Sequence, residues 1–335
     1  MRNRLCVTCN EAAAGYLKAS QVSIPARSQI IPVRSSFIRS PVIEVDLGDS
    51  DKQQALPSIH PAVEQILQNW RDADQVELYI DPDPNSQLLM VYLLSHALAA
   101  EVGHTNLLIF QGITPWGQQL PQTQSSSVVA PISVENQHLT AAAAIWSAYS
   151  ASTPHAWLGL SLDELSHFPF MTQTREALLD DLPSAETGLG SSERLVLMTV
   201  ADEGCTVGQV ARAFASDPLH LLSLPLVVDL ITTLASGVSP LIAGLSGRLR
   251  ATDFFDDVDA WDTYVGSYLG LTADGHKIIA GAIDFVETQG VDRWWGGTRL
   301  MGHTSWRWDK QTRVLIPPEN LMCENIETTA WICGT

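Results

Sequence analysis

Apolar segments in the first third of the chain follow a repeated order. Short apolar runs typical of buried strands are each followed by a longer helical stretch. The predicted strands are residues 5–9, 30–33, 77–80 and 107–110, and the predicted helices are residues 12–18, 61–70 and 87–102. This order predicts a Rossmann-like α/β domain over residues 1–125, with a parallel sheet covered on both faces. In such sheets a ligand cleft lies at the carboxyl ends of the strands.

The rest of the chain predicts a helical connector and a second domain. An Ala-rich helix at residues 140–149 and a helical stretch at residues 162–181 indicate a connector over residues 126–190, and the composition changes near residue 185. Ser191-Ser192-Glu193 then gives a helix N-cap signal. Further helices are expected at residues 195–200, 206–214, 226–235 and 273–287, with a strand at residues 269–272. This order is typical of a winged-helix-like α+β domain, residues 191–318, while residues 319–335 form a tail without an interpretable pattern.

The most unusual stretch is residues 290–309, which holds four Trp, four Gly and three Arg. Gly296-Gly297 predicts a turn, and the alternation of Trp306, Arg307 and Trp308 predicts a strand with both indoles on one face. The hairpin is interpreted either as a structural aromatic lid or as a pocket wall that presents guanidinium groups to an anion. The pocket residues in the second case are Arg293, Trp294, Arg299 and Arg307. His303 of the same hairpin either contacts the anion and transfers a proton, or makes a structural hydrogen bond.

Composition narrows the classes of partner. The chain of 335 residues has a formal net charge of −18 and is 45% hydrophobic and 17% charged, which is typical of a folded globular protein. The negative charge disfavours nucleic acids and anionic membrane surfaces, because their phosphates are bound by Lys and Arg. The first residues lack the apolar core of a signal peptide, and no apolar run reaches the length of a membrane span. We therefore expect a soluble cytoplasmic protein.

Polar residues that follow the predicted strands are the candidates for the cleft. Asp81, Asp83 and Asn85 follow the strand at residues 77–80, where carboxylates suit a cation or general-base chemistry. The same Asp-Pro-Asp-Pro sequence is also typical of a stiff turn that caps the next helix. The full set expected at the cleft is Asn10, Glu11, Arg34, Arg39, Asp81, Asp83 and Gln87. Arginines in a strongly acidic protein favour an anionic or carboxylate-bearing ligand.

The five Cys residues do not suggest a disulfide framework, because their number is odd and they are widely spaced. Cys6 and Cys9 have the spacing of a redox or metal pair, which Cys323 and Cys333 would complete as a zinc site. Residues three apart on a strand point to opposite faces, however, and Cys6 does not open a helix. The sequence therefore favours buried, inert thiols and predicts no metal site.

Charge argues against DNA binding by the winged-helix-like region. Residues 192–290 contain five Lys and Arg against 13 Asp and Glu. The helix in the reading position, residues 226–235, has no basic residue and carries Asp229. Duplex readers need several phosphate contacts as well as side chains that read bases. We expect this apolar helix to be buried, either in a protein interface or against the first domain.

Several motifs in the second half of the chain support a family resemblance. The most specific are Gly290-Val-Asp-Arg-Trp-Trp-Gly-Gly and Trp306-Arg-Trp-Asp309. The others are Trp146, Phe168-Pro-Phe-Met171, Leu182-Pro183, Gly188-Leu189 and Glu193. Together they resemble the bacterial domain-of-unknown-function family 1835, over most of the chain up to about residue 314. The resemblance implies an N-terminal α/β domain, a helical connector and a winged-helix-like tail, and it implies no established activity.

The N-terminal motifs of that family are degenerate here. Where its members have a His-x-x-Asn-Gly-Asp-Ser loop, this chain has Cys6, Cys9, Asn10, Glu11 and Ala12. The family's Trp-x-Asp and Gly-Pro-Val correspond to Val33-Arg34-Ser35 and Ser40-Pro41-Val42. Its Glu-x-Asp and Asp-Gln-Leu correspond to Asp81, Asp83, Ser86 and Gln87-Leu88. We therefore expect any chemistry of that loop to be changed or lost.

Two functional hypotheses follow. In the first, the chain binds or transforms a small anionic ligand in the cleft of the N-terminal sheet, with Asp81, Asp83 and His303 as catalytic candidates. In the second, it is a non-enzymatic interaction or regulatory protein whose C-terminal domain binds another protein or a second copy. The sequence assigns no reaction, cofactor or oligomeric state.

Overall fold

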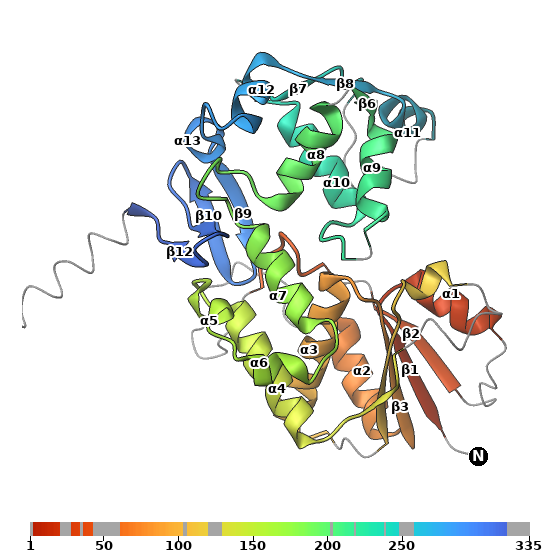
Figure 1. Cartoon of the computed structure of the whole chain (residues 1–335). Helices are drawn as coiled ribbons and strands as arrows, with labels where there is room; N and C mark the ends of the chain where they lie inside the picture. Colours follow the sequence, from red (N-terminus) through yellow and green to blue (C-terminus); the bar gives the residue numbers. More distant parts are fainter. Residues whose placement is uncertain are drawn as a thin grey trace, which may run out of the picture. The chain divides into compact units, whose positions relative to one another are not determined.

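The computed structural model describes residues 3–20, 28–33, 36–42, 61–102, 106–119, 129–201, 204–217, 219–237, 239–247 and 258–319. The chain divides into two compact units (Figure 1). The first is Met1–Arg175 with Trp294–Thr298, and the second is Glu176–Arg293 with Arg299–Thr335. In the described part of the chain, no helix combines the length and the apolar character that crossing a bilayer requires.

A mostly parallel sheet forms the centre of the first unit. Its strands are β1 (Arg4–Thr8), β2 (Ser28–Pro32), β3 (Gln75–Ile80), β4 (Leu107–Gln111) and β5 (Ile132–Ser133). Its helices are α1 (Glu11–Ala19), α2 (Pro61–Arg71), α3 (Pro84–Ala99), η1 (Trp116–Gln118), α4 (Asn136–Ser150), α5 (His155–Leu158) and α6 (Leu162–Ser166). Among the described residues the strand order is β2-β1-β3-β4-β5, with β5 antiparallel to β4 and the other pairs parallel. The predicted parallel α/β sheet is confirmed.

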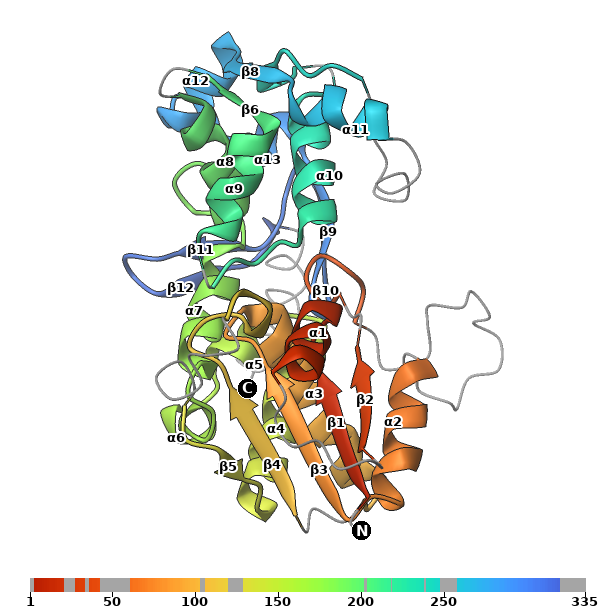
Figure 2. The ribbon, with the colours of Figure 1, turned by 90° about the vertical axis from the view of Figure 1, so that its right-hand side faces the viewer.

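The strand order differs from that of a Rossmann sheet. The first four strands follow the order 2-1-3-4 of a flavodoxin-like doubly wound sheet, whereas a Rossmann sheet begins 3-2-1-4. The expected class, a parallel α/β sheet, is thus found, while the sequence had predicted no strand order. Figure 2 shows β1 to β4 side by side, with α3 and α4 behind the sheet and α1 near the carboxyl ends of the strands. The winding direction changes between β1 and β3, which is where a doubly wound sheet opens a crevice.

One face of this sheet carries the core of the first unit. Leu5 and Val7 of β1 and Leu78 and Ile80 of β3 are buried on it. Residues 88–94 of α3 are buried on every side of the helix, in keeping with their uninterrupted apolar sequence. Burying each Leu contributes about 1.5–3 kcal/mol, so this helix anchors the sheet. The carboxyl ends of β1 and β3 are thereby held on a rigid frame.

The second unit is mainly helical and contains short antiparallel strands. Its helices are α8 (Ser191–Ala201), α9 (Val207–Ala215), α10 (Leu224–Leu234), α11 (Val258–Val265), α12 (Ala273–Ile279) and α13 (Phe285–Gln289), and α7 (Met171–Asp180) enters it from the first unit. Its strands are β6 (Cys205–Thr206), β7 (Ile242–Ala243), β8 (Tyr268–Leu271), β11 (Arg307–Asp309) and β12 (Val314–Ile316). The strands β9 (Val291–Trp295) and β10 (Thr298–Gly302) have residues in both units, because Trp294–Thr298 belongs to the first. Within the described residues, β8 lies between β6 and β7 and is antiparallel to both.

Two predicted helices are each divided in two. The helix expected at residues 273–287 ends at Ile279, and the chain turns at Gly281, whose φ is 69°. A new helix then starts at Phe285 because Asp284 caps it, accepting a hydrogen bond from the Glu287 amide at 2.9 Å. The stretch at residues 162–181 likewise divides into α6 and α7 on either side of Pro169. Local caps and turns thus override the longer helical pattern.

The Trp-rich stretch forms the predicted hairpin. β9 and β10 pair, and the turn between them is Gly296-Gly297, with a φ of 55° at Gly296. Trp306 and Trp308 are both buried, as expected of indoles on one face. Trp308 lies in β11, which pairs with β12 in a second hairpin that the sequence pattern had not indicated. Trp295, Trp306 and Trp308 are therefore core residues.

Candidate functional site

Three of the predicted cleft residues meet at the carboxyl ends of β1 and β3. Asn10 follows β1 and caps α1, accepting a hydrogen bond from the Ala13 amide at 2.8 Å through Oδ1. Its Nδ2 donates to Asp81 Oδ2, also at 2.8 Å, across the point where the sheet changes direction. Gln87 of α3 is fully buried and donates from Nε2 to the Asp81 carbonyl at 2.8 Å. Asn10, Asp81 and Gln87 thus form one polar cluster.

Asp81 is the most chemically unusual member of this cluster. Its relative exposure is only 3%, and its other carboxylate oxygen accepts a hydrogen bond from the Trp116 amide at 2.6 Å. Burial raises the pKa of this carboxyl above its usual value, and the nearby Asp83 acts in the same direction. The bonds from Trp116 and Asn10 oppose that rise without cancelling it. The site therefore offers a shielded carboxyl group that takes up a proton more readily than an exposed aspartate.

Asp83 and Asn85 have structural partners of their own. Asp83 caps α3, with Oδ1 accepting a hydrogen bond from the Ser86 amide at 3.0 Å. Asn85 Oδ1 accepts from the Phe37 amide at 2.8 Å, which ties the loop after β2 to the start of α3. Of the two interpretations of the Asp-Pro-Asp-Pro turn, the capping one describes Asp83. Asp81 instead faces the polar cluster.

Replacing Asp83 with Ala is therefore expected to lower the free energy of unfolding by about 1 kcal/mol, the usual value of an N-cap. Asp83→Ser should recover most of that loss, because a serine hydroxyl accepts the same amide hydrogen bond. Guanidinium denaturation of the two variants tests this. Equal losses for Ala and Ser would show that the carboxylate does something other than cap α3.

The remaining predicted cleft residues are less well placed. Glu11 is exposed in the first turn of α1. Arg39 lies in the loop held by Asn85, and its φ of 59° is in the left-handed region, which is uncommon for a long side chain. Arg34 lies outside the described residues. The structure thus places Arg39 in a loop joined to the carboxyl edge of the sheet through α3.

A second polar network in the first unit escaped the sequence interpretation. Glu77 of β3 is buried and forms an ion pair with Arg4 of β1. It also accepts hydrogen bonds from Tyr79 Oη at 2.8 Å and Gln75 Nε2 at 2.7 Å. Burial, followed by the charge of Glu77, raises the pKa of the Cys6 thiol to about 12. The alternation of polar residues along β3 was the available signal, but pairing them required the register between β1 and β3.

Both N-terminal cysteines are buried, which agrees with the expectation of inert thiols. Cys9 and Cys6 are free, and burial is the main cause that raises the pKa of the Cys9 thiol well above its usual range. Cys323 and Cys333 lie outside the described residues. In the described ranges, no three His, Cys, Asp or Glu side chains gather in a way that could hold a metal ion.

The hairpin arginines belong to the second unit, where each has a carboxylate partner. Arg293 contacts Asp181 through Nη1 at 3.2 Å, and its Nε lies 3.9 Å from Glu193 Oε1. Asp181 also accepts a hydrogen bond from the Ser192 amide at the start of α8, at 3.2 Å. Because all three charged side chains are largely buried, Arg293 ties β9 to α8. In this geometry Arg293 holds elements of the second unit together.

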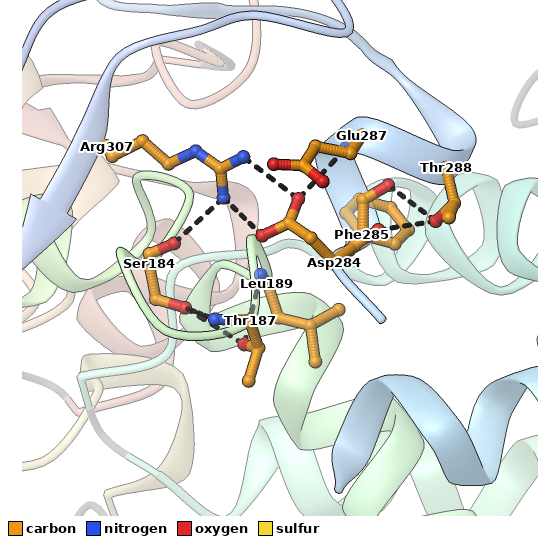
Figure 3. Close-up of polar contacts among 8 residues, drawn as sticks. All are labelled: Ser184, Thr187, Leu189, Asp284, Phe285, Glu287, Thr288 and Arg307. Carbon is orange, nitrogen blue, oxygen red and sulfur yellow. Dashed lines mark hydrogen bonds and ion pairs between the residues drawn. The ribbon is translucent and has the colours of Figure 1, made fainter. Parts of the chain in front are cut away.

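Arg307 makes the most complete set of contacts, shown in Figure 3. Its guanidinium donates to both carboxylate oxygens of Asp284, at 2.6 and 2.9 Å, and to the Ser184 carbonyl at 3.2 Å. Phe285 next to Asp284 donates its amide to the Thr187 carbonyl at 2.8 Å. Arg307 therefore joins β11, the segment 184–187 and the start of α13. Burial opposes ionisation of Asp284, but Arg307 and the α13 amides together hold its pKa below the usual value.

The other hairpin candidates are more exposed or differently placed. Arg299 forms a surface ion pair with Asp292. His303 is exposed, and its Nδ1 lies 2.9 Å from the Glu287 carbonyl, which matches the structural alternative for this residue. Trp294 is half-buried and belongs to the first unit. The guanidinium groups of Arg293, Arg299 and Arg307, which were predicted to line a pocket, therefore form ion pairs with carboxylates of the second unit.

Comparisons with known proteins add little. No protein-family model matches the chain, and no curated protein does. One similar solved structure is the DNA-binding, cleavage and re-ligation domain of Plasmodium falciparum topoisomerase II. The TM-score is 0.45 at 12% identity, and the alignment covers 98% of this chain and 56% of that one. The chain thus spans little more than half of that structure, and a similarity of this size supports no functional argument.

Proposed function

We propose that the first unit binds a small ligand at the carboxyl ends of β1 and β3. The observation that carries this proposal is the hydrogen bond between Asn10 and Asp81, which lies where the sheet changes its winding direction. Ligands of doubly wound sheets bind outside this point because the flanking loops diverge there. A buried carboxyl group with a raised pKa at the same point is typical of binding and catalytic sites.

The proposed ligand carries a negative group, such as a phosphate or a carboxylate. Arg39, in the loop that Asn85 joins to the start of α3, is the basic residue that the proposal assigns to this negative group. A positive φ at Arg39 costs conformational energy, and such strain is more frequent at functional sites than elsewhere. Asn10 and Asp81 are bonded to each other and to the Ala13 and Trp116 amides, so in this proposal they hold the loops after β1 and β3 in place around the ligand.

The test is a thermal-shift and calorimetric screen of the full chain with phosphate, nucleoside monophosphates and small dicarboxylates. A true ligand should raise the melting temperature in proportion to the logarithm of its concentration. Arg39→Ala should weaken binding at least about tenfold, since it removes a charge-assisted contact. Arg299→Ala removes an exposed arginine of the second unit and serves as the control. No stabilising anion, or equal effects of the two substitutions, would refute the proposal.

A second candidate function is protein–protein interaction through a winged-helix-like second unit. It is favoured by the helix and strand order from α8 to β8 and by the position of β8 between β6 and β7. The helix in the reading position, α10, exposes Leu224, Pro225 and Asp229 and has no basic residue, so a protein suits it better than DNA. Membership of family 1835 would agree with this arrangement. Light scattering of the wild-type chain and of Leu224→Glu tests self-association, and an unchanged monomer in both would contradict the dimer form of this candidate.

A further inference from the structure

A groove in the second unit lies apart from every residue considered so far as a ligand contact. It has a volume of about 400 Å³, within the usual range of small-molecule sites. It lies beside the last turn of α10 and beside α13. The described lining residues are Thr232, Thr233, Leu234, Ser236, Gly237, Leu241, Phe285, Gln289 and Gly290.

Three polar side chains of the groove, those of Thr232, Thr233 and Gln289, donate hydrogen bonds into the protein. The Tyr264 hydroxyl donates to the Val228 carbonyl at 3.1 Å, so the Thr232 hydroxyl, 2.9 Å away, must donate to Tyr264. Thr233 donates to the Asp229 carbonyl at 2.8 Å. Gln289 donates from Nε2 to the Ser239 carbonyl at 2.8 Å, which leaves Oε1 as the acceptor of its amide. These three side chains therefore present acceptor oxygens, which suit a ligand that donates hydrogen bonds.

The electrostatics of the groove favour a positive charge on that ligand. No Lys, Arg or His occurs among its described lining residues. The groove is beside the C-terminal turn of α10, where the helix dipole stabilises a cation. Asp229 lies one turn earlier on α10, and the chain as a whole carries −18. Phe285 contributes an aromatic ring, which attracts cations, while Leu234 and Leu241 contribute apolar surface.

We propose that this groove binds a small organic ammonium ion: a protonated primary amine with a compact apolar body. The ammonium hydrogens are donated to Gln289 Oε1 and to the oxygens at the end of α10. The apolar body packs on Phe285 and the two leucines. This site is independent of the ligand proposed for the first unit, because all its residues belong to the second unit.

Three probes with one ring size test the charge preference on the full chain at pH 7: benzylamine, which is protonated at this pH, benzyl alcohol and benzoate. Calorimetry should show benzylammonium binding about tenfold more tightly than the alcohol, and benzoate not binding, since only the cation gains from the helix dipole and the ring. Equal affinity for the alcohol, or no binding of benzylammonium at millimolar concentrations, would overturn the proposal.

Two variants locate the binding in this groove. Ser236→Asp should bind benzylammonium roughly fivefold more tightly, because it adds to the groove lining a carboxylate, which makes a strong hydrogen bond to an ammonium ion. Gln68→Glu adds the same charge on the exposed side of α2 and should leave the affinity unchanged. If both substitutions tightened binding equally, the effect would be one of net charge and the site would be rejected. Thr233→Lys, at an exposed position of α10, should abolish binding while leaving the far-UV circular dichroism unchanged; retained binding would reject the site.

Discussion

Replacing Gly297 with Ala is expected to lower the free energy of unfolding by about 3 kcal/mol, at the upper end of the effects of overpacking. The Gly297 amide donates to the Tyr149 carbonyl at 2.9 Å at the end of α4. A methyl group on Gly297 would overlap the Ser150 carbonyl and lie 2.7 Å from the Ala151 oxygen. These obstacles are backbone atoms at a helix end, so a change of side-chain rotamer cannot relieve the overlap.

The substitution should also disturb the aromatic packing beside the turn. The Trp295 ring lies 5.6 Å from the Tyr149 ring and 6.2 Å from the Trp157 ring, all within the first unit. Guanidinium denaturation, read by near-ultraviolet circular dichroism, follows both the stability and this packing. Gly15→Ala is the matched control, because a methyl group there meets no atom within 4 Å and an exposed helical Gly gains about 0.5–1 kcal/mol on replacement. Wild-type stability in Gly297→Ala would show that the turn does not lie against α4.

Replacing Arg307 with Met is expected to lower the free energy of unfolding by about 3 kcal/mol. The side chains of Arg307 and Asp284 are only 15% and 16% exposed, so removing the guanidinium leaves a largely desolvated carboxylate without its ion-pair partner. The substitution also removes the hydrogen bond to the Ser184 carbonyl. Thermal and guanidinium unfolding of the full chain measure the loss.

Arg299→Ala is the control for this prediction. Arg299 and Asp292 are 38% and 70% exposed, so solvent screens their ion pair and the expected loss is below about 1 kcal/mol. The double variant Arg307→Met with Asp284→Asn should be more stable than Arg307→Met alone, because it removes the uncompensated charge. Equal losses for Arg307→Met and Arg299→Ala would show that the Arg307–Asp284 ion pair does not stabilise the junction of β11 with α13.

The same ion pair predicts a pH dependence. The pKa of Asp284 is lower in the folded chain than in the unfolded one, so the unfolded state binds the proton more tightly. Asp284 therefore stabilises the fold above the usual carboxyl pKa, and this contribution disappears as the pH falls through the depressed value. The acid side of the stability profile should be shallower in Arg307→Met. Parallel profiles for the wild type and the variant would contradict this account.

The sequence pattern predicted the elements better than it predicted the site. The spacing of apolar residues predicted β1 to β4 and α1 to α4. Asn10 and Thr206 cap two helices with their own side chains, so the starts of those helices are marked in the sequence. The breaks at Pro169 and Asp284 were missed because helical periodicity continues across them. The clustering of Asn10, Asp81 and Gln87 was expected from the rule that strand ends meet at one edge of the sheet. The hydrogen bonds among them depend on side-chain positions in three dimensions, which the spacing of residues along the chain does not reveal.

The sequence by itself determined the parallel sheet, the approximate positions of its first four strands, the Gly296-Gly297 turn and the shared burial of Trp306 and Trp308, because these depend on local periodicity and backbone freedom. Only the tertiary structure decided the order β2-β1-β3-β4, the pairing of Glu77 with Arg4 and the engagement of Arg293 and Arg307 by carboxylates. Each of these joins residues that lie far apart in the chain. An arginine can pair with any carboxylate that lies close enough, and the tertiary fold determines which carboxylate that is.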